Sequence, residues 1–308
     1  MRDKEEKIIG ILSIIELIEN INARHAKKIR ENIQLDDDEY VDRFAAFLTK
    51  YESFLVKGEK TLSYAVECYM KMIDDMIYEQ VQFVKTGKYS CLSFEDANKK
   101  VYSNSAIMDY YMHGLLMSQF LWMHHYDILI YFSQQLSALS VSVESYLEIG
   151  GGHGLYTNEA VSILKKAKRA DLIDISQSSI DLAKQFVSSE MVTFVCKDIF
   201  DYTSDVRYDL ITIGEVLEHL EQPDLMLRRL GDLLAKEGRV FLTIPINSPA
   251  IDHIYLFSTM GEIENFIDVN GFEIVSKEYF VSEQNISLAK AEKFKVPAMF
   301  AGLIKKKV

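Results

Sequence analysis

The chain has 308 residues and a formal net charge of −12, with 46 acidic against 34 basic side chains. Proteins that bind nucleic acids usually present a basic surface, so this charge argues against a nucleic-acid partner. No apolar run reaches the roughly 18 residues that span a membrane, the first seven residues are too charged for a secretory signal, and three scattered cysteines do not suggest a disulfide framework. We therefore expect a cytoplasmic protein without a membrane partner.

Residues 1–140 have the composition of an all-helical domain. They contain no proline and few glycines, and their apolar residues recur at helical spacing. The predicted helices are 4–32, 38–56, 59–86, 104–115 and 117–138. Such a domain is expected to pack against the rest of the chain, to join two copies as a homodimer, or to form a lid over a site.

Aromatic residues, methionines and histidines gather in the segment 102–126. With a helix break near Gly114, one face of this segment presents Tyr111, Leu115, Ser118, Trp122 and His125. An aromatic stripe at helical spacing is typical of a core, but aromatic faces also attract positively charged ligands. The segment therefore predicts either core packing or a cover in which Tyr111, Ser118 and Trp122 face a cationic ligand.

A glycine-rich turn follows the predicted strand 146–149. Gly150, Gly152 and Gly154 occupy alternate positions, where glycine permits a positive φ and a close approach of the backbone to a ligand. The spacing is G-x-G-x-G rather than the dinucleotide fingerprint G-x-G-x-x-G, because position 155 is leucine. The turn predicts a nucleotide-type cofactor site or, in its plainer interpretation, a tight connection between a strand and a helix.

Two carboxylates follow the next predicted strands. The expected elements are a helix over 157–168, a strand over 170–174, a helix over 177–188 and a strand over 192–196. Asp174 lies 20 residues after Gly154, where a doubly wound sheet places an acid that binds ribose hydroxyls. Asp198 follows the second of these strands. Either acid could instead cap a helix, but their order and spacing favour a cofactor site.

These motifs in this order resemble the class I S-adenosylmethionine-dependent methyltransferases, over residues 144–308. The resemblance implies a Rossmann-like α/β domain over residues 141–308 with a seven-stranded sheet, preceded by the all-helical domain. It also implies S-adenosylmethionine as the cofactor, with Glu148 near its methionine end, Asp174 on its ribose and Asp198 on its adenine. The residues implied in cofactor binding are Glu148, Gly150, Gly152, Gly154, Asp174, Ile175, Asp198, Ile199, Gly214 and Glu215.

Methyl transfer needs an acceptor atom in line with the breaking C–S bond, and a general base only when that atom carries a proton. Histidine is the natural base near neutral pH, and we place His219 and His253 first and His125 third. The stretch Glu215-Val-Leu-Glu218-His219, completed by His253, also resembles the magnesium-binding segment of small-RNA 2′-O-methyltransferases and of some catechol-type quinone methyltransferases. In relatives without a metal, these residues stabilise the helix after the fourth strand. A metal-free site is the main expectation, and Mg²⁺ the alternative.

The loop after the fifth predicted strand contains Asn247 and Tyr255 and is stiffened by Pro245 and Pro249, which predicts a polar wall for the substrate. We expect methyl transfer to an oxygen or nitrogen atom of a small polar or zwitterionic molecule. One alternative is attack on the aminocarboxypropyl carbon, to transfer that group or to cyclise the cofactor on its own amine, with release of methylthioadenosine. Another is a non-catalytic protein that binds the cofactor or its product.

Overall fold

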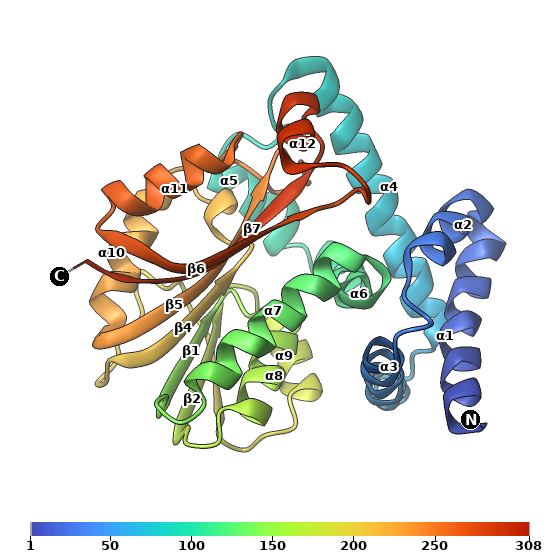
Figure 1. The fold of residues 1–308 in the computed structure, drawn as a ribbon, viewed down its shortest axis with the longest axis horizontal. Helices are drawn as coiled ribbons and strands as arrows, with labels where there is room; N and C mark the ends of the chain where they lie inside the picture. The colour runs from blue at the N-terminus through green and yellow to red at the C-terminus, as the bar shows by residue number, and fades with distance from the viewer. Residues whose placement is uncertain (1, 308) are drawn as a thin grey trace.

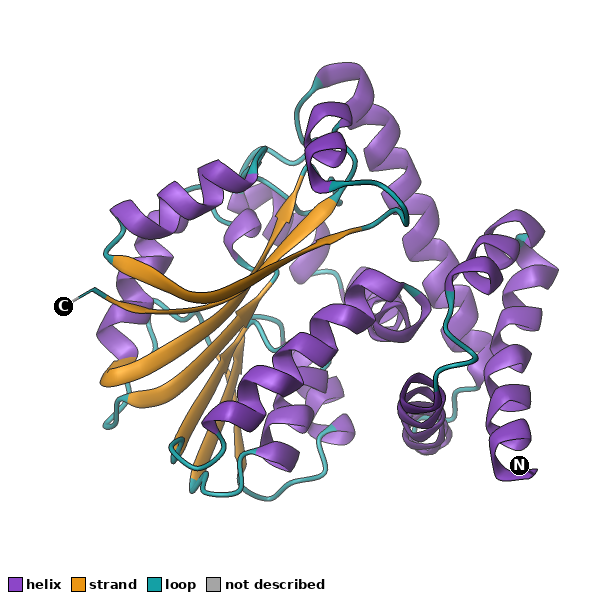
Figure 2. Cartoon of the chain, in the orientation of Figure 1, coloured by secondary structure: helices purple, strands orange, loops and turns teal. Residues whose placement is uncertain are grey.

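The computed structural model describes residues 2–307 and shows one mixed sheet between two layers of helices (Figure 1, Figure 2). The strands are β1 (Ser145–Ile149), β2 (Arg169–Asp174), β3 (Val192–Cys196), β4 (Tyr208–Gly214), β5 (Leu234–Ile246), β6 (Phe272–Val281) and β7 (Ala298–Lys306). Their order is β3-β2-β1-β4-β5-β7-β6, with the first five parallel and β7 antiparallel to both β5 and β6. The predicted seven-stranded Rossmann-like class is confirmed.

Each face of the sheet carries its own helices (Figure 1). Helices α7 (Met123–Leu139), α8 (Leu155–Ile163) and α9 (Gln177–Phe186) cover one face, and α10 (Pro223–Leu233) and α11 (Met260–Val269) cover the other. Strands β1 and β2 are buried along most of their length, as parallel strands covered on both faces must be. Because β1, β2 and β4 are parallel, their carboxyl ends meet at one edge of the sheet.

The N-terminal helices pack beside this edge. They are α1 (Arg2–Ile21), α2 (Ala23–Asn32), α3 (Asp38–Lys57), α4 (Leu62–Thr86), α5 (Phe94–Ala97), a π-helical turn (Asn98–Tyr102) and α6 (Ser105–Leu121). Phe47 of α3 joins them to the sheet layer, with ring centroids 4.5 Å from Phe120 and 6.3 Å from Phe186 of α9. One hydrophobic core therefore runs from α1 to the face covered by α7. Among residues 2–307, no helix combines the length and apolarity that a membrane crossing requires.

Two helix breaks differ from the predicted ones. The expected helix 4–32 is interrupted at Asn22, whose side chain accepts a hydrogen bond from the His25 N–H and so caps α2. The break expected near Gly114 falls instead at Trp122, which is extended between α6 and α7. Gly114 lies inside α6, where Met72 of α4 packs closely against it. A Cβ at this position would lie 2.8 Å from Met72 Sδ. A close approach between two helices, rather than a turn, requires this glycine.

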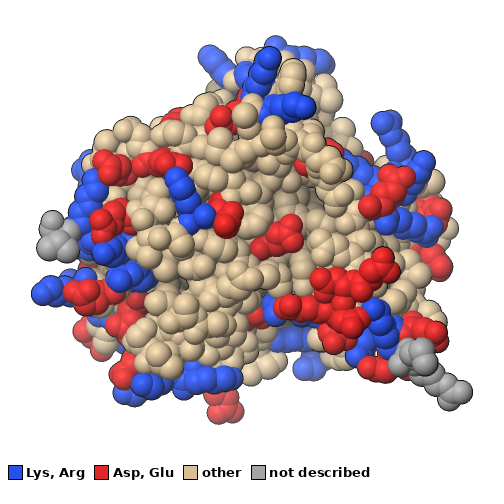
Figure 3. Space-filling view, in the orientation of Figure 1, with Lys and Arg blue, Asp and Glu red and all other residues tan. Residues whose placement is uncertain are grey.

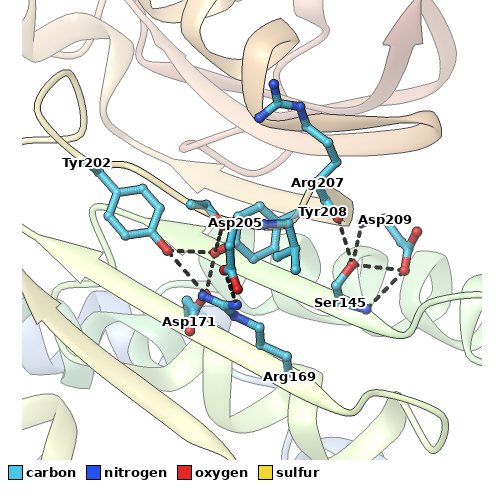
Figure 4. Close-up of polar contacts among 10 residues, drawn as sticks. Ser145, Arg169, Asp171, Tyr202, Asp205, Arg207, Tyr208 and Asp209 are labelled. Atoms are coloured by element: carbon cyan, nitrogen blue, oxygen red, sulfur yellow. Dashed lines mark hydrogen bonds and ion pairs between the residues drawn. The ribbon is translucent and has the colours of Figure 1, made fainter.

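A buried carboxylate ties β2 to β4 at the amino ends of the strands, opposite the edge described above (Figure 4). Asp171 Oδ2 accepts hydrogen bonds from Arg169 Nε at 2.7 Å, from Tyr202 Oη at 3.3 Å and from Tyr208 Oη. Arg169 also donates to Asp205 at 2.8 Å. The buried charge is tolerated because Arg169 and two hydroxyl groups donate to Oδ2, although Oδ1 has no hydrogen-bond partner among residues 2–307.

Replacing Asp171 by asparagine is expected to lower the free energy of unfolding by about 1.5–3 kcal/mol, because hydrogen bonds to a charged acceptor are lost. The change should leave ligand binding at the opposite edge of the sheet within about twofold of the wild type. Urea denaturation measures the first effect and calorimetry the second. An unchanged unfolding midpoint would show that this network does not stabilise the sheet.

Candidate functional site

A cavity of about 900 Å³ lies between the carboxyl edge of the sheet and the N-terminal helices. Its volume is within the roughly 300–1,000 Å³ range of small-molecule sites. The predicted residues that line it are Glu148, Gly150, Gly152, Asp174, Ile175, Asp198, Ile199, Gly214, Glu215, Tyr111, Trp122, His125, His219 and His253. Much of the remaining lining is apolar, and includes Ile73, Met76, Met108, Met112, Leu115 and Met299.

The glycine turn forms the floor of this cavity beyond β1. Gly150, Gly152 and Gly154 have φ values of 69°, 48° and 76°, which side chains rarely adopt. A Cβ on Gly150 would lie 2.4 Å from Val216 Cγ2, so this residue must remain glycine. Gly154 does not line the cavity, contrary to prediction, because it begins α8 and packs against α9.

Glu148 places a buried carboxyl group beside the glycine turn. Its Oε2 accepts a hydrogen bond from Thr157 Oγ1, and no basic side chain pairs with it among residues 2–307. Burial raises the pKa of Glu148 to about 8. A cationic group of a ligand would favour the charged carboxylate here.

Asp174 ends β2 and faces the same cavity. Its Oδ2 accepts a hydrogen bond from the Gly152 N–H at 2.9 Å, and its Oδ1 accepts one from the Ser176 N–H at 2.8 Å. Ser176, not Asp174, caps α9, so the predicted alternative of a helix cap at Asp174 is wrong. The carboxylate instead fixes the glycine turn against the end of β2, and its remaining lone pairs can accept hydrogen bonds from a ligand.

Two imidazoles converge on Glu218 at the other side of the cavity. His219 Nδ1 lies 3.1 Å from the carbonyl oxygen of Asp252, and His253 Nδ1 lies 2.6 Å from that of Ser248. Because a carbonyl only accepts, each neutral ring carries its hydrogen on Nδ1. The two Nε2 lone pairs are then free, at 3.7 Å and 3.9 Å from Glu218 Oε1.

The Glu218 carboxylate is fully buried, and neither oxygen has a hydrogen-bond partner among residues 2–307. Ligand atoms of Glu218, His219 and His253 all lie within 4.8 Å of one another. Metal-binding histidines typically donate their second ring N–H to a carbonyl group, as both do here. The three residues therefore have the chemistry of a divalent-cation site.

Glu215 does not join this cluster, although the sequence grouped it there. Its Oε1 accepts a hydrogen bond from Thr243 Oγ1 at 3.0 Å, and its backbone has a φ of 53°. Burial raises the pKa of Glu215 to about 8. The residue lines the cavity as predicted for cofactor binding.

The aromatic segment 102–126 lines the cavity on the side of the N-terminal helices. The Tyr111 hydroxyl group is buried without a hydrogen-bond partner among the described residues. The Trp122 ring stacks on His124 at a centroid distance of 5.6 Å. Ser118 does not reach the cavity, because its Oγ lies 3.0 Å from His125 Nδ1 and holds that ring in place. Burial lowers the pKa of His125 well below its ordinary value, which disfavours its predicted role as a base.

Asn247 and Tyr255, which were predicted to form a polar wall, do not line the cavity. Asn247 Nδ2 donates to the Ser258 carbonyl group at 3.0 Å, which closes its own loop. Tyr255 packs on Phe257 with ring centroids 4.7 Å apart. The polar lining of this loop comes from Ser248 and the Asp252–His253 pair instead.

Two tyrosines that support the site, Tyr69 and Tyr102, were not among the predicted site residues. Tyr69 Oη accepts a hydrogen bond from Trp122 Nε1 at 2.8 Å and lies 2.8 Å from His25 Nε2, which pins the Trp122 ring from α4 and α2. Tyr102 Oη donates to Asp252 Oδ2 at 3.1 Å and so supports the loop of His253. These contacts join segments distant in sequence, which no local pattern reveals.

Binding of a cationic cofactor is expected to release about one proton from Glu148 near pH 7. Its pKa of about 8 keeps the free carboxyl group largely protonated, whereas a neighbouring ammonium group favours the ionised form. The affinity for the cofactor should therefore rise with pH and level off above about pH 8, where Glu148 is already ionised in the free protein. Calorimetry in buffers of different ionisation heat measures the release, and Glu148→Gln should abolish it. A wild type whose binding heat is independent of the buffer would contradict the assignment.

Known proteins carry the same domain. Residues 147–240 match a methyltransferase domain family. A ubiquinone biosynthesis O-methyltransferase of Coxiella burnetii is 31% identical over 135 residues, covering 42% of this chain and 53% of that protein. The mitochondrial ubiquinone biosynthesis O-methyltransferase of Saccharomyces cerevisiae is 29% identical over 130 residues, covering 41% and 40%. The chain thus spans about half the length or less of these relatives.

The fold also resembles a solved structure. Mitomycin 7-O-methyltransferase superposes with a TM-score of 0.52 at 11% identity, covering 76% of this chain and 68% of that chain. The domain match, the sheet order and the placement of the glycine turn with Glu148 and Asp174 agree with one another. Residues 147–240 therefore carry a methyltransferase domain, and its cofactor is S-adenosylmethionine.

Proposed function

We propose that the protein transfers the methyl group of S-adenosylmethionine to a hydroxyl oxygen of a small molecule, at a site that holds a divalent cation. The relatives named above are O-methyltransferases, which favours oxygen over nitrogen as the acceptor atom. The observation that carries the proposal is the unpartnered Glu218 carboxylate facing two free imidazole lone pairs beside the cofactor.

The donor set fits a cation better than it fits a purely structural cluster. A fully buried carboxylate without hydrogen bonds is costly, and a cation between Glu218, His219 and His253 would satisfy it. Two imidazoles with one carboxylate suit a transition-metal dication, and Mg²⁺ less well. A bound dication lowers the pKa of a hydroxyl group that coordinates it, which supplies a nucleophilic oxygen near neutral pH.

The protein's own residues would perform the other tasks. Glu148 pairs with the ammonium group of the cofactor, and Asp174 accepts hydrogen bonds from its ribose. Tyr111 and Trp122 cover the cationic sulfonium with aromatic faces. This cover also excludes water from the transfer step.

The cavity lining favours a less polar acceptor than the sequence predicted. Methionine and aliphatic side chains from α4 and α6 line the space opposite the glycine turn, and the predicted polar residues of the loop after β5 point elsewhere. We infer an acceptor with a largely apolar body and one hydroxyl group, or two adjacent ones, directed at His219 and His253.

Removal of the cation is expected to stop turnover without affecting cofactor affinity. With catechol as a probe acceptor, EDTA treatment should lower the rate by about 100-fold, and added Mn²⁺, Zn²⁺ or Mg²⁺ should restore it. Titration with Co²⁺ provides a readout independent of activity, because imidazole coordination changes its visible absorption. Full turnover in EDTA together with no Co²⁺ spectrum would remove the cation from the proposal and leave His219 as the candidate base, because burial lowers the pKa of His253 to about 4.

A further inference from the structure

The second half of α4 exposes an apolar stripe that nothing in the described residues covers. Ile77, Val81 and Val84 are 54%, 44% and 75% exposed. Their spacing of four and three residues places them on one face of the helix. Tyr78 lies beside them and is also exposed. Large apolar side chains that gather in this way usually mark an interaction surface.

Lysines lie at one end of this stripe and on the neighbouring α12. Lys85 and Lys88 lie at the end of α4, and Lys290, Lys293 and Lys295 lie on or beside α12 (Leu288–Phe294). The two elements are in contact, because Lys295 Nζ lies 5.6 Å from the ring centroid of Phe83 in α4. Figure 3 shows the basic side chains gathered at the top of the molecule, over α12 and the end of α4 in Figure 1.

The charge of this surface is not neutralised locally. None of the five lysines forms a salt bridge within residues 2–307. Of the nearby acids, Glu79 is buried and the Glu292 carboxylate accepts the Met260 N–H at 2.7 Å. Exposed Phe294 adds another apolar side chain, 66% exposed, among the lysines. A chain with a net charge of −12 thus presents a local basic and apolar surface.

We propose that this surface, formed by the end of α4 and by α12, binds the anionic face of a lipid bilayer. Exposed apolar side chains beside lysines that form no salt bridge match the acyl boundary and the phosphate headgroups of such a bilayer. The end of α4 and α12 project from the rest of the molecule (Figure 1), so they suit an extended fluid surface better than a folded partner. A second copy of the chain would bring like charges together.

The surface reaches the edge of the cavity. Ile77 both belongs to the exposed stripe and lines the cavity, together with Ile73 and Gln80 of the same helix. A bilayer in contact with α4 would therefore lie at the cavity rim. The sequence predicted no membrane partner because it contains no apolar run long enough to span a bilayer, whereas the proposed contact is peripheral.

Co-sedimentation of the full chain with vesicles tests the proposal without requiring methyl transfer. The protein should bind vesicles of phosphatidylcholine mixed with phosphatidylglycerol, bind phosphatidylcholine alone roughly tenfold more weakly or worse, and dissociate at high salt. Val81→Asp with Val84→Asp should abolish binding, as should Lys293→Glu with Lys295→Glu. Thermal melting and S-adenosylmethionine binding confirm that these surface variants remain folded.

Matched controls change the same chemistry elsewhere on the surface. Val56→Asp with Val269→Asp alters two other exposed valines, and Lys166→Glu with Lys236→Glu alters two exposed lysines outside α4 and α12. Both controls should bind vesicles as the wild type does. Absence of binding, equal binding to both lipid compositions, or equal losses in the controls would overturn the proposal. A concentration-dependent dimer that Val81→Asp with Val84→Asp disrupts would overturn it in favour of a second copy.

Discussion

Replacing Glu218 by glutamine is expected to reduce the rate of methyl transfer by about 100-fold or more, while the affinity for S-adenosylmethionine changes by less than about twofold. Glutamine keeps the volume of the side chain but removes the charge that a cation needs between His219 and His253. Because Glu218 does not line the cavity, its loss should spare cofactor contacts. Initial rates at saturating cofactor and calorimetric affinities measure the two effects.

The control is Glu237→Gln, which makes the same chemical change at an exposed position. It should leave both the rate and the affinity unchanged. His219→Ala and His253→Ala should reproduce the loss seen for Glu218→Gln, together with the loss of the Co²⁺ spectrum. If Glu218→Gln turned over at the wild-type rate, the cluster would have no part in the reaction.

Replacing Asp174 by alanine is expected to weaken S-adenosylmethionine binding by about 1–3 kcal/mol, or roughly 5- to 150-fold. Two contributions add in the same direction. The ribose hydroxyl groups lose their acceptor, and the Gly152 N–H, which donates to Asp174 at 2.9 Å, is released from the geometry that the glycine turn needs. Isothermal titration calorimetry measures the change.

Asp201→Ala, at an exposed position close to Asp198 in the sequence, is the matched control and should bind the cofactor as the wild type does. Asp174→Asn should retain part of the affinity, because the amide oxygen can still accept one hydrogen bond. Equal affinities for the wild type and Asp174→Ala would place the ribose elsewhere in the cavity.

The sheet and the cofactor residues could be predicted because local sequence encodes them. Buried parallel strands are continuous apolar runs, and in this fold the residues after each strand meet at one edge. Glu148, Asp174 and Asp198 therefore line the same cavity, as their positions at or just after the ends of the strands indicated. The pairing of Glu218 with His253 follows from the same rule, since β4 and β5 are parallel neighbours.

What failed depends on contacts between distant segments. Gly114 was predicted to break a helix, but it lies inside α6 because Met72 of α4 leaves no room for a side chain there. The break lies at Trp122, whose ring nitrogen donates a hydrogen bond to Tyr69 of α4. Asn247 and Tyr255 were predicted to form a polar wall. Instead, Asn247 forms a hydrogen bond within its own loop and Tyr255 packs on Phe257. The direction of a loop side chain is set by tertiary packing, which the residue type alone does not specify.

The measurement that tests the central claim most directly follows the fate of the cofactor. The purified chain, with a divalent cation, a catechol acceptor and S-adenosylmethionine deuterated on its methyl group, is analysed by mass spectrometry. Methyl transfer to oxygen predicts S-adenosylhomocysteine and an acceptor that carries the intact deuterated methyl group as an ether. Methylthioadenosine as the product would contradict the account, since it would place the attack on the aminocarboxypropyl carbon.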